Sequence, residues 1–163
     1  MRPSVEELIE SCRHSLREVI VPDLSDEWAK YVARAMDRVL DHLAVRWELE
    51  GKLLAEDSAE LRALFPELEA AVAGSAPLRP AAAELSAASA EPALGAPISV
   101  SALAEENERL RSSLRRFVEA LDASGDAEAP AHGLVLRYLR REVDRESRLA
   151  KPVFMHFGPR AGS

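Results

Sequence analysis

Apolar residues near the N-terminus recur three or four positions apart, which is the spacing of one helix face. Ser4 and Glu7 form the pattern of a capping box, and Pro22 marks the end of the helix that they begin. The apolar stripe of this helix contains Val5, Leu8, Ile9, Cys12, Leu16, Val19 and Ile20. Because Cys12 belongs to the stripe, we expect its thiol to be buried and inert.

A second and longer apolar stripe follows Ser25. It contains Trp28, Val32, Ala35, Met36, Val39, Leu43 and Trp47. Asp26 and Glu27 suit the first turn of a helix, where the helix dipole favours acidic side chains. Gly51 is a typical stop signal, so the pattern predicts a helix that ends near this residue.

A third helix is predicted to begin at Asp57 or Ser58 and to end near Gly74. Proline lacks a backbone N–H group and clashes with the preceding turn of a helix. Pro66 therefore predicts a break or kink at Phe65.

Residues 75–98 contain four prolines and few large apolar residues, so they predict a flexible linker with at most a helical turn at 82–89. This linker would separate two helical parts. The N-terminal part would comprise the three helices of residues 1–74. The C-terminal part would be a helical hairpin at 99–150 that packs on the first part and is followed by a tail at 151–163.

The first helix of the predicted hairpin carries a heptad pattern with an asparagine at an a position. Its candidate interaction residues are Asn107, Leu110, Leu114 and Phe117. Two readings stay open, which are packing inside an antiparallel bundle and a seam for self-association. The pattern itself extends over less than three heptads.

The last predicted helix covers about residues 132–150 and is expected to stop at Pro152. Its inward-facing residues would be Leu134, Val135, Tyr138, Leu139 and Val143. Phe154 and Phe157 follow in the tail, where they would either fold back over the bundle or anchor a partner.

Composition supports a helical protein. Apolar residues make up 47% of the 163 residues, yet only 5% are aromatic and only 7 are glycine. A β-sandwich or barrel needs more aromatic strands and glycine turns. The sequence therefore predicts an all-α fold, a four- to five-helix bundle with a long Ala/Pro-rich linker between helices three and four.

The formal net charge of −7 disfavours a generic nucleic-acid binder. Cys12 is the single cysteine, which excludes an internal disulfide and fits a reducing cytoplasm. The N-terminus does not resemble a signal peptide, and no apolar run is long enough for a membrane span. Abundant alanine with few lysines is typical of a GC-rich bacterial gene.

The chain lacks the motifs of known catalytic and metal sites. None of the four histidines belongs to an HExxH or Glu-x-x-His pattern, so no metal is expected. Phosphate-binding glycine loops and nucleophile elbows are also absent from the sequence. These observations favour a protein without a cofactor and make catalysis the less favoured alternative.

Two groups of charged residues are candidates for ligand binding. The first lies on the second predicted helix and comprises Asp37, Arg38, Asp41 and His42. The second is the arginine ridge of the last helix, with Arg137, Arg141 and Arg145. Both groups have an alternative reading as a solvated or internally paired surface, because opposite charges lie three or four residues apart.

The charge is also unevenly distributed along the chain. Residues 1–74 contain 9 basic and 16 acidic residues, whereas residues 132–163 contain 7 basic and 3 acidic residues. The arginine ridge could thus dock on an acidic partner or a phosphate group, or on the acidic N-terminal half itself.

Two segments resemble a family of small bacterial helical proteins. They are LREVIVPDLSDEWAKYVARAMDRVLDHLAVRWELE and the later LRYLRREVDRESRLAKP. Members of that family are encoded beside aminoglycoside-phosphotransferase-like kinases and acyl-CoA dehydrogenases. The resemblance implies an accessory role in acyl-CoA metabolism, with such a kinase or dehydrogenase as a protein partner.

Two hypotheses of function follow from these patterns. The first is a non-catalytic accessory bundle that mediates protein–protein interaction and forms a homodimer. The alternative is a helical bundle that binds or transforms a small acidic, phosphate-bearing ligand such as an acyl-CoA.

Overall fold

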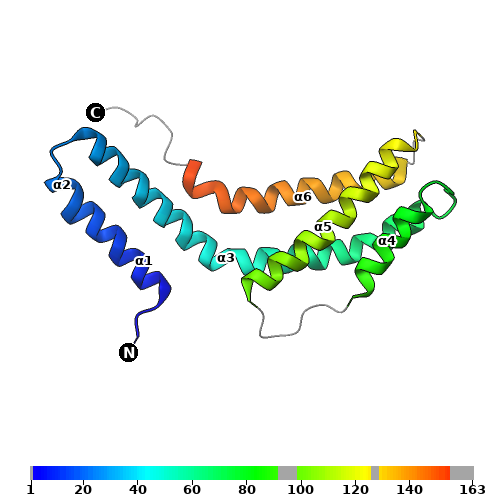
Figure 1. The fold of residues 1–163 in the computed structure, drawn as a ribbon, viewed down its shortest axis with the longest axis horizontal. Coiled ribbons are helices and arrows are strands. Elements are labelled where there is room, and N and C mark those ends of the chain that lie inside the picture. Colours follow the sequence, from blue (N-terminus) through cyan, green and yellow to red (C-terminus); the bar gives the residue numbers. More distant parts are fainter. Residues whose placement is uncertain (1, 92–98, 126–128, 155–163) are drawn as a thin grey trace. The chain divides into compact units, whose positions relative to one another are not determined.

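The computed structural model describes residues 2–91, 99–125 and 129–154, and these contain no β-strand (Figure 1). The helical elements are α1 (Val5–His14), the π-helical η1 (Ser15–Ile20), α2 (Val21–Asp23), α3 (Glu27–Ala71), α4 (Arg79–Ala90), α5 (Val100–Ala123) and α6 (Ala129–Phe154). The predicted all-α class is confirmed. None of the described helices is long and apolar enough to cross a membrane.

The chain divides into two compact units. Unit 1 comprises Met1–Glu50 and Glu146–Ser163, and unit 2 comprises Gly51–Arg145. The division differs from the expected one at residues 74 and 99, because α3 and α6 each contribute to both units.

Polar side chains cap two helices of unit 1, at Ser4 as the sequence predicts and at Asp26, which the sequence places in the first turn rather than at the cap. The Ser4 hydroxyl accepts a hydrogen bond from the backbone N–H of Glu7 at 3.1 Å, and the Ser4 N–H donates to the Glu7 carboxylate at 2.7 Å. This capping box satisfies two N–H groups that a helix start leaves unpaired. At the start of α3, the Asp26 carboxylate accepts from the N–H of Ala29 at 2.8 Å.

Ion pairs join α1 and η1 to α3 within unit 1. Arg13 contacts Asp37 at 3.2 Å and Asp41 at 2.8 Å, and Arg17 contacts Asp37 at 2.8 Å. Few apolar side chains are buried here, and Leu16 is the one large example among the described residues of the unit. Unit 1 therefore has a polar helix–helix contact and a very small core.

The expected burial of Cys12 is wrong, because its side chain is exposed. The apolar stripe of α1 predicted a buried face. The arginines of α1 and η1 face α3 instead, so most of the stripe, Cys12 included, is left in solvent.

The second and third predicted helices form one continuous helix, α3. The expected stop at Gly51 and the expected break at Phe65 are both wrong, since α3 runs to Ala71 with Pro66 inside it. Pro66 removes one hydrogen bond. Leu64, Phe65 and Leu68 are buried in one core on both sides of it, and this packing holds the helix together.

The predicted linker contains helix α4, so the expectation of a flexible segment is wrong for Arg79–Ala90. Leu85 is fully buried and Ala88 nearly so. Alanine is the best helix former, and a few buried apolar residues fix such a helix on a core. Residues 92–98 lie outside the described residues.

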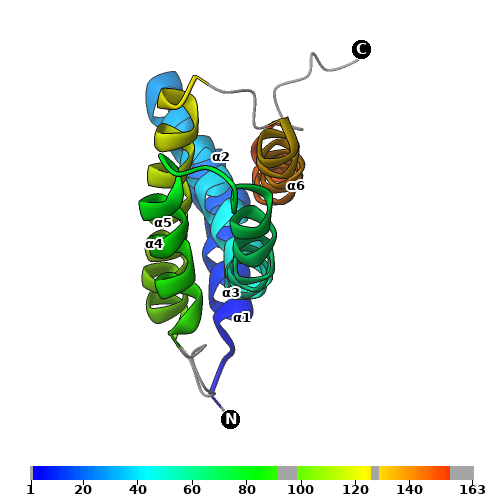
Figure 2. The ribbon, with the colours of Figure 1, turned by 90° about the vertical axis from the view of Figure 1, so that its right-hand side faces the viewer.

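Unit 2 holds the main hydrophobic core. Figure 2 shows α4 and α5 next to each other in this unit. The buried apolar residues that form the core come from all four of its helices and from the turn between α3 and α4: Leu61, Leu64, Phe65, Leu68, Val72, Leu78, Leu85, Ala88, Leu110, Leu114, Phe117, Leu121, Ala131, Val135 and Tyr138. Gly125, with a φ angle of 64°, lies just after the C-terminal end of α5.

Helix α6 differs from its prediction in length and in its buried face. It begins at Ala129 and continues through Pro152 to Phe154 rather than stopping at the proline. Val135 and Tyr138 are buried as expected, but Leu139 and Val143 are exposed.

Candidate functional site

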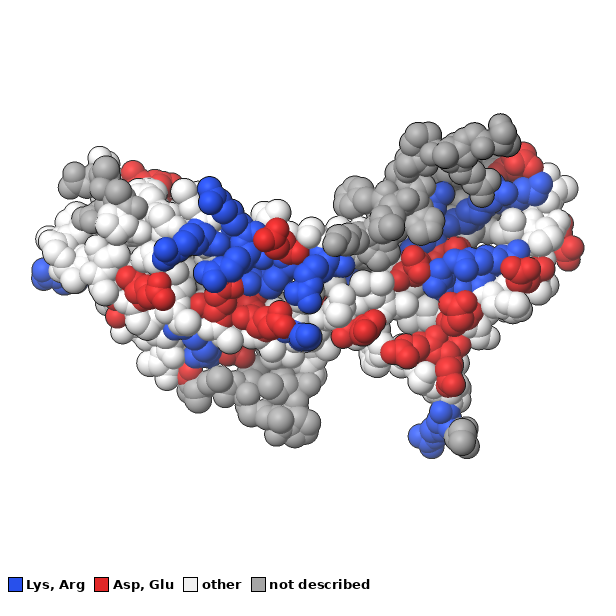
Figure 3. Space-filling model, turned by 180° about the vertical axis from the view of Figure 1, so that it is seen from behind, with Lys and Arg blue, Asp and Glu red and all other residues white. Residues whose placement is uncertain are grey.

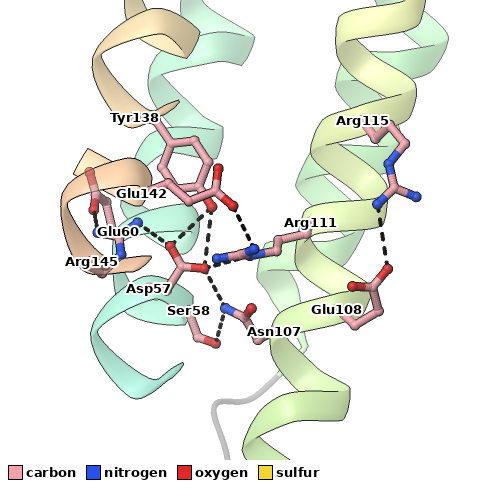
Figure 4. Close-up of polar contacts among 10 residues, drawn as sticks. All are labelled: Asp57, Ser58, Glu60, Asn107, Glu108, Arg111, Arg115, Tyr138, Glu142 and Arg145. Atoms are coloured by element: carbon pink, nitrogen blue, oxygen red, sulfur yellow. Dashed lines mark hydrogen bonds and ion pairs between the residues drawn. The ribbon is translucent and has the colours of Figure 1, made fainter. Parts of the chain in front are cut away.

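A buried carboxylate, Asp57 of α3, lies at the centre of a polar cluster in unit 2 (Figure 4). Only 2% of Asp57 is exposed. The Asn107 amide donates to its Oδ2 at 2.7 Å, and the same amide lies 3.3 Å from the Ser58 hydroxyl. Asn107 therefore joins α5 to α3.

Two arginines neutralise this carboxylate. Arg111 Nε of α5 donates to Asp57 Oδ2 at 2.8 Å, and Arg145 of α6 donates to Oδ1. Arg145 also pairs with Glu60, and the other end of Arg111 contacts Glu142 at 2.6 Å. Because both arginines have a second carboxylate partner, the cluster alternates positive and negative charge across three helices.

The Tyr138 hydroxyl completes the cluster, 3.1 Å from Asp57 Oδ1. Burial raises the pKa of Tyr138, and the negative charge of Asp57 raises it further. The guanidinium carbon of Arg145 lies 5.6 Å from the centre of the Tyr138 ring, which is a cation–π distance. Tyr138 therefore remains a neutral hydrogen-bond donor at physiological pH.

Asp57 also favours the charged form of its arginine partners. Burial alone would lower the pKa of Arg111, but the hydrogen bond and charge of Asp57 outweigh it and raise that pKa. Burial acts in the same direction on Arg145, where the hydrogen bond to Glu60 and the charge of Asp57 raise the pKa. Buried polar networks of this kind rigidify a core and fix the positions of its helices.

The sequence pattern marks Asp57 only as the start of a helix and does not predict its polar cluster. Its partners lie 50 to 88 residues away in the sequence. The signal that could have revealed it is an acidic residue within the apolar pattern of a helix, together with the a-position Asn107.

A groove of about 290 Å³ lies beside the Asp57 cluster, between α5 and α6. Its apolar lining comes from Leu114, Val118, Val135 and Leu139, and its polar lining from Glu108, Arg111, Arg115, Tyr138 and Glu142. The two arginines are paired with carboxylates, since Arg115 lies 3.6 Å from Glu108 and Arg111 contacts Asp57 and Glu142. The groove is thus partly apolar and close to electrically balanced.

The described residues offer no cluster of three or more His, Cys, Asp or Glu side chains that could hold a metal ion. On the face drawn in Figure 3, basic and acidic side chains lie next to one another over much of the surface. Among the described residues, Arg116 with Glu84 and Arg109 with Glu91 are ion pairs within the chain.

The first ligand-binding candidates lie on α3 in unit 1. Asp37 and Asp41 pair with Arg13, and Asp37 also pairs with Arg17. His42 is half-buried and its Nδ1 atom has no hydrogen-bond partner. Arg38 is half-buried on the same helix. The structure thus uses the two carboxylates to hold α1 and η1.

The arginines of the ridge also form ion pairs within the chain. Arg145 and Arg141 both pair with Glu60, the latter at 2.6 Å, and Arg137 lies 3.9 Å from Glu67. Both glutamates belong to α3, so the ridge docks on an acidic segment of its own unit.

The heptad residues of α5 are buried in unit 2. Leu110 and Phe117 are fully buried and Leu114 is 4% exposed, while Asn107 bonds to Asp57. Phe154 is the last residue of α6, and Phe157 lies outside the described residues.

Many large apolar side chains of unit 1 are exposed instead. On α3 they form a single stripe, which we call the α3 stripe and define as Trp28, Val32, Met36, Val39, Leu43 and Trp47. Each member is between 40% and 70% exposed. Tyr31 stacks on Trp28 at 5.5 Å between ring centres and is also exposed. Contiguous exposed patches of this kind mark interaction surfaces.

Comparison of the chain with protein-family models, curated proteins and solved structures finds no match. The roles of the candidate sites are therefore inferred from the geometry of the structure.

Proposed function

We propose that the protein is a non-catalytic helical interaction protein that forms a homodimer through the α3 stripe of unit 1. The observation that carries the proposal is the exposure of both tryptophans, Trp28 at 70% and Trp47 at 60%, on one side of one helix. Tryptophan is enriched at the energetic centres of protein interfaces.

The small core of unit 1 supports the same proposal. Helices gain most of their stability in proteins from packing an apolar face, and α1, η1 and the first half of α3 bury little besides Leu16. A partner that covers the α3 stripe would supply the missing core. The ion pairs of Arg13 and Arg17 hold the helices together on the polar side.

The proposal assigns the heptad residues of α5 to the inside of unit 2 and moves the interface to unit 1. The accessory role, and a phosphotransferase-like kinase or an acyl-CoA dehydrogenase as a further partner, rest on the family resemblance. A cytoplasmic location rests on the single cysteine. Purification of the tagged protein together with each candidate enzyme tests that part.

Sedimentation velocity of three proteins tests self-association. Wild type is expected to be a dimer. Val39→Glu places a charge in the α3 stripe and is expected to be a monomer. Val143→Glu is the matched control, because Val143 is 67% exposed and Val39 59%, and only Val39 belongs to the stripe. A monomeric wild type, or a dimeric Val39→Glu variant, would contradict the proposal.

A second candidate function is the binding of a small amphipathic anion, such as an acyl-CoA, in the groove beside Asp57. The groove supports it with an apolar lining and with Arg115, which is 63% exposed. Calorimetric titration with acyl-CoA and with nucleotides tests this candidate. It predicts binding that Arg115→Ala weakens and Arg79→Ala does not, and the absence of heat with every ligand would contradict it.

A further inference from the structure

The α3 stripe has an internal symmetry that bears on its partner. Its six members occupy positions i, i+4, i+8, i+11, i+15 and i+19, which lie within an arc of about 100° on a helix. They form three pairs that are equidistant from the midpoint between Asp37 and Arg38: Trp28 with Trp47, Val32 with Leu43, and Met36 with Val39.

We infer that the stripe pairs with the same stripe of a second copy in antiparallel orientation, about a twofold axis at this midpoint. This inference rests on the proposed function and specifies its geometry. In a twofold interface each patch meets an identical patch, so residue i contacts j and j contacts i. The pairs of the stripe meet this condition, since a tryptophan meets a tryptophan at each end and smaller apolar residues meet near the axis.

The charged residues of the same helix face favour the antiparallel over the parallel arrangement. Arg46 and Glu50 lie on this face and pair with each other at its C-terminal end. A parallel pair would bring each of them next to its own copy, and like charges at an interface are unfavourable. In the antiparallel pair they lie opposite the uncharged Ala29 and Ser25.

The spacing of the stripe indicates how the two helices would wind around each other. Its second half repeats the first after 11 residues, so Trp28, Val32 and Met36 correspond to the next three members. A parallel left-handed coiled coil needs a seven-residue repeat, whereas an 11-residue repeat does not produce that supercoil. The stripe therefore lacks the pattern of a leucine zipper and suits a short, nearly straight helix pair.

The apolar area is of the size that a dimer needs. A specific interface buries roughly 800 Å² on each partner. An aromatic side chain can bury roughly 150–250 Å², and Trp28, Tyr31 and Trp47 are each more than half exposed. With the four aliphatic members of the stripe, they supply most of such an area.

The test is a set of distances between spin labels on single cysteines in a Cys12→Ser background. Ser25→Cys and Glu48→Cys place labels at exposed positions near the two ends of the stripe. From the 1.5 Å rise per residue, the antiparallel dimer separates two Ser25 labels by about 38 Å and two Glu48 labels by about 32 Å along the axis. A mixed dimer with one label of each kind gives a short distance, because the two sites nearly coincide along the axis.

A parallel dimer gives the opposite pattern. Its homodimers would show short distances, and the mixed dimer would show about 35 Å along the axis. That result would overturn the antiparallel inference and leave self-association in place. Sedimentation of the same samples separates this from a failure of the proposed function, which would show only monomer.

The chain's own C-terminal segment is the other possible occupant of the stripe. Deletion of residues 155–163 distinguishes it from a second copy. The inference predicts that the truncated protein still dimerises with the same label distances. A monomeric wild type whose tryptophan emission shifts to the red on truncation would overturn the inference.

Discussion

The Tyr138 hydroxyl of α6 lies 3.1 Å from Asp57 Oδ1 of α3, a contact between residues 81 positions apart. The same carboxylate binds Asn107 and Arg111 of α5. One buried side chain therefore fixes the relative positions of three helices in unit 2. The apolar core around it sets how closely they pack.

Replacement of Asp57 tests the importance of this cluster. Asp57→Asn keeps the shape of the side chain but leaves Arg111 and Arg145 without their shared carboxylate. Removal of one partner from a buried ion pair is strongly destabilising, and we expect a loss of about 3 kcal/mol in the free energy of unfolding.

Urea denaturation measures this loss. Glu67→Gln is the matched control, because its pair with Arg137 spans 3.9 Å at an exposed position, and we expect a change below about 1 kcal/mol. Equal effects of the two variants would contradict the role assigned to Asp57.

Tyr138 predicts a loss of stability in alkaline solution. Its pKa is raised in the folded protein, so the unfolded chain releases the proton first as the pH rises. Its contribution is fully present below pH of about 10, the pKa of an unfolded tyrosine. Above that pH the free energy of unfolding should fall by up to about 1.4 kcal/mol per pH unit.

Urea unfolding of Tyr138→Phe between pH 8 and pH 11 checks this dependence. The variant should lose the alkaline slope that wild type shows. Tyr31→Phe removes the only other phenol of the chain, at a position 58% exposed, and should keep the slope. An unchanged slope in Tyr138→Phe would show that another group causes it.

Packing of helix α4 on the core can be tested at Leu85, which lies in the segment that the sequence predicts to be a linker. In a flexible linker, the Leu85 side chain would be exposed to solvent. In the structure it is fully buried. Leu85→Ala should therefore reduce the free energy of unfolding by about 2–5 kcal/mol, as for other buried leucines.

The same urea measurement on Ser86→Ala provides the control, since Ser86 is the exposed neighbour of Leu85. A Leu85→Ala variant as stable as Ser86→Ala would mean that α4 does not pack on the core.

Local sequence patterns predicted where helices form better than they predicted which residues pack against those helices. The Ser4–Glu7 capping box and the helical spacing after Ser25 depend on residues a few positions apart, and both appear in the structure. Pro66 and Gly51 are also local signals, but both were overridden by the packing of the residues around them. Tertiary contacts can override these signals because a glycine inside a helix costs only about 1 kcal/mol and a proline about 3 kcal/mol relative to alanine.

The candidate sites were harder to predict because they depend on distant contacts. An apolar stripe shows which side of a helix avoids water, but not whether the same chain covers it. The stripes of α5 and of the first half of α3 look alike in sequence, yet Leu110 is fully buried and Leu43 is 47% exposed. Arg13 and Arg17 explain the difference, since their ion pairs place α1 and η1 on the polar side of α3.

Tryptophan fluorescence tests the central claim most directly, because the two tryptophans of the chain are the two ends of the α3 stripe. Concentrated wild type and Val143→Glu should both emit at shorter wavelength than Val39→Glu, and dilution should move wild type towards the emission of Val39→Glu. Wild type that emits at the same wavelength as Val39→Glu at every concentration would contradict the claim that a second copy covers the stripe.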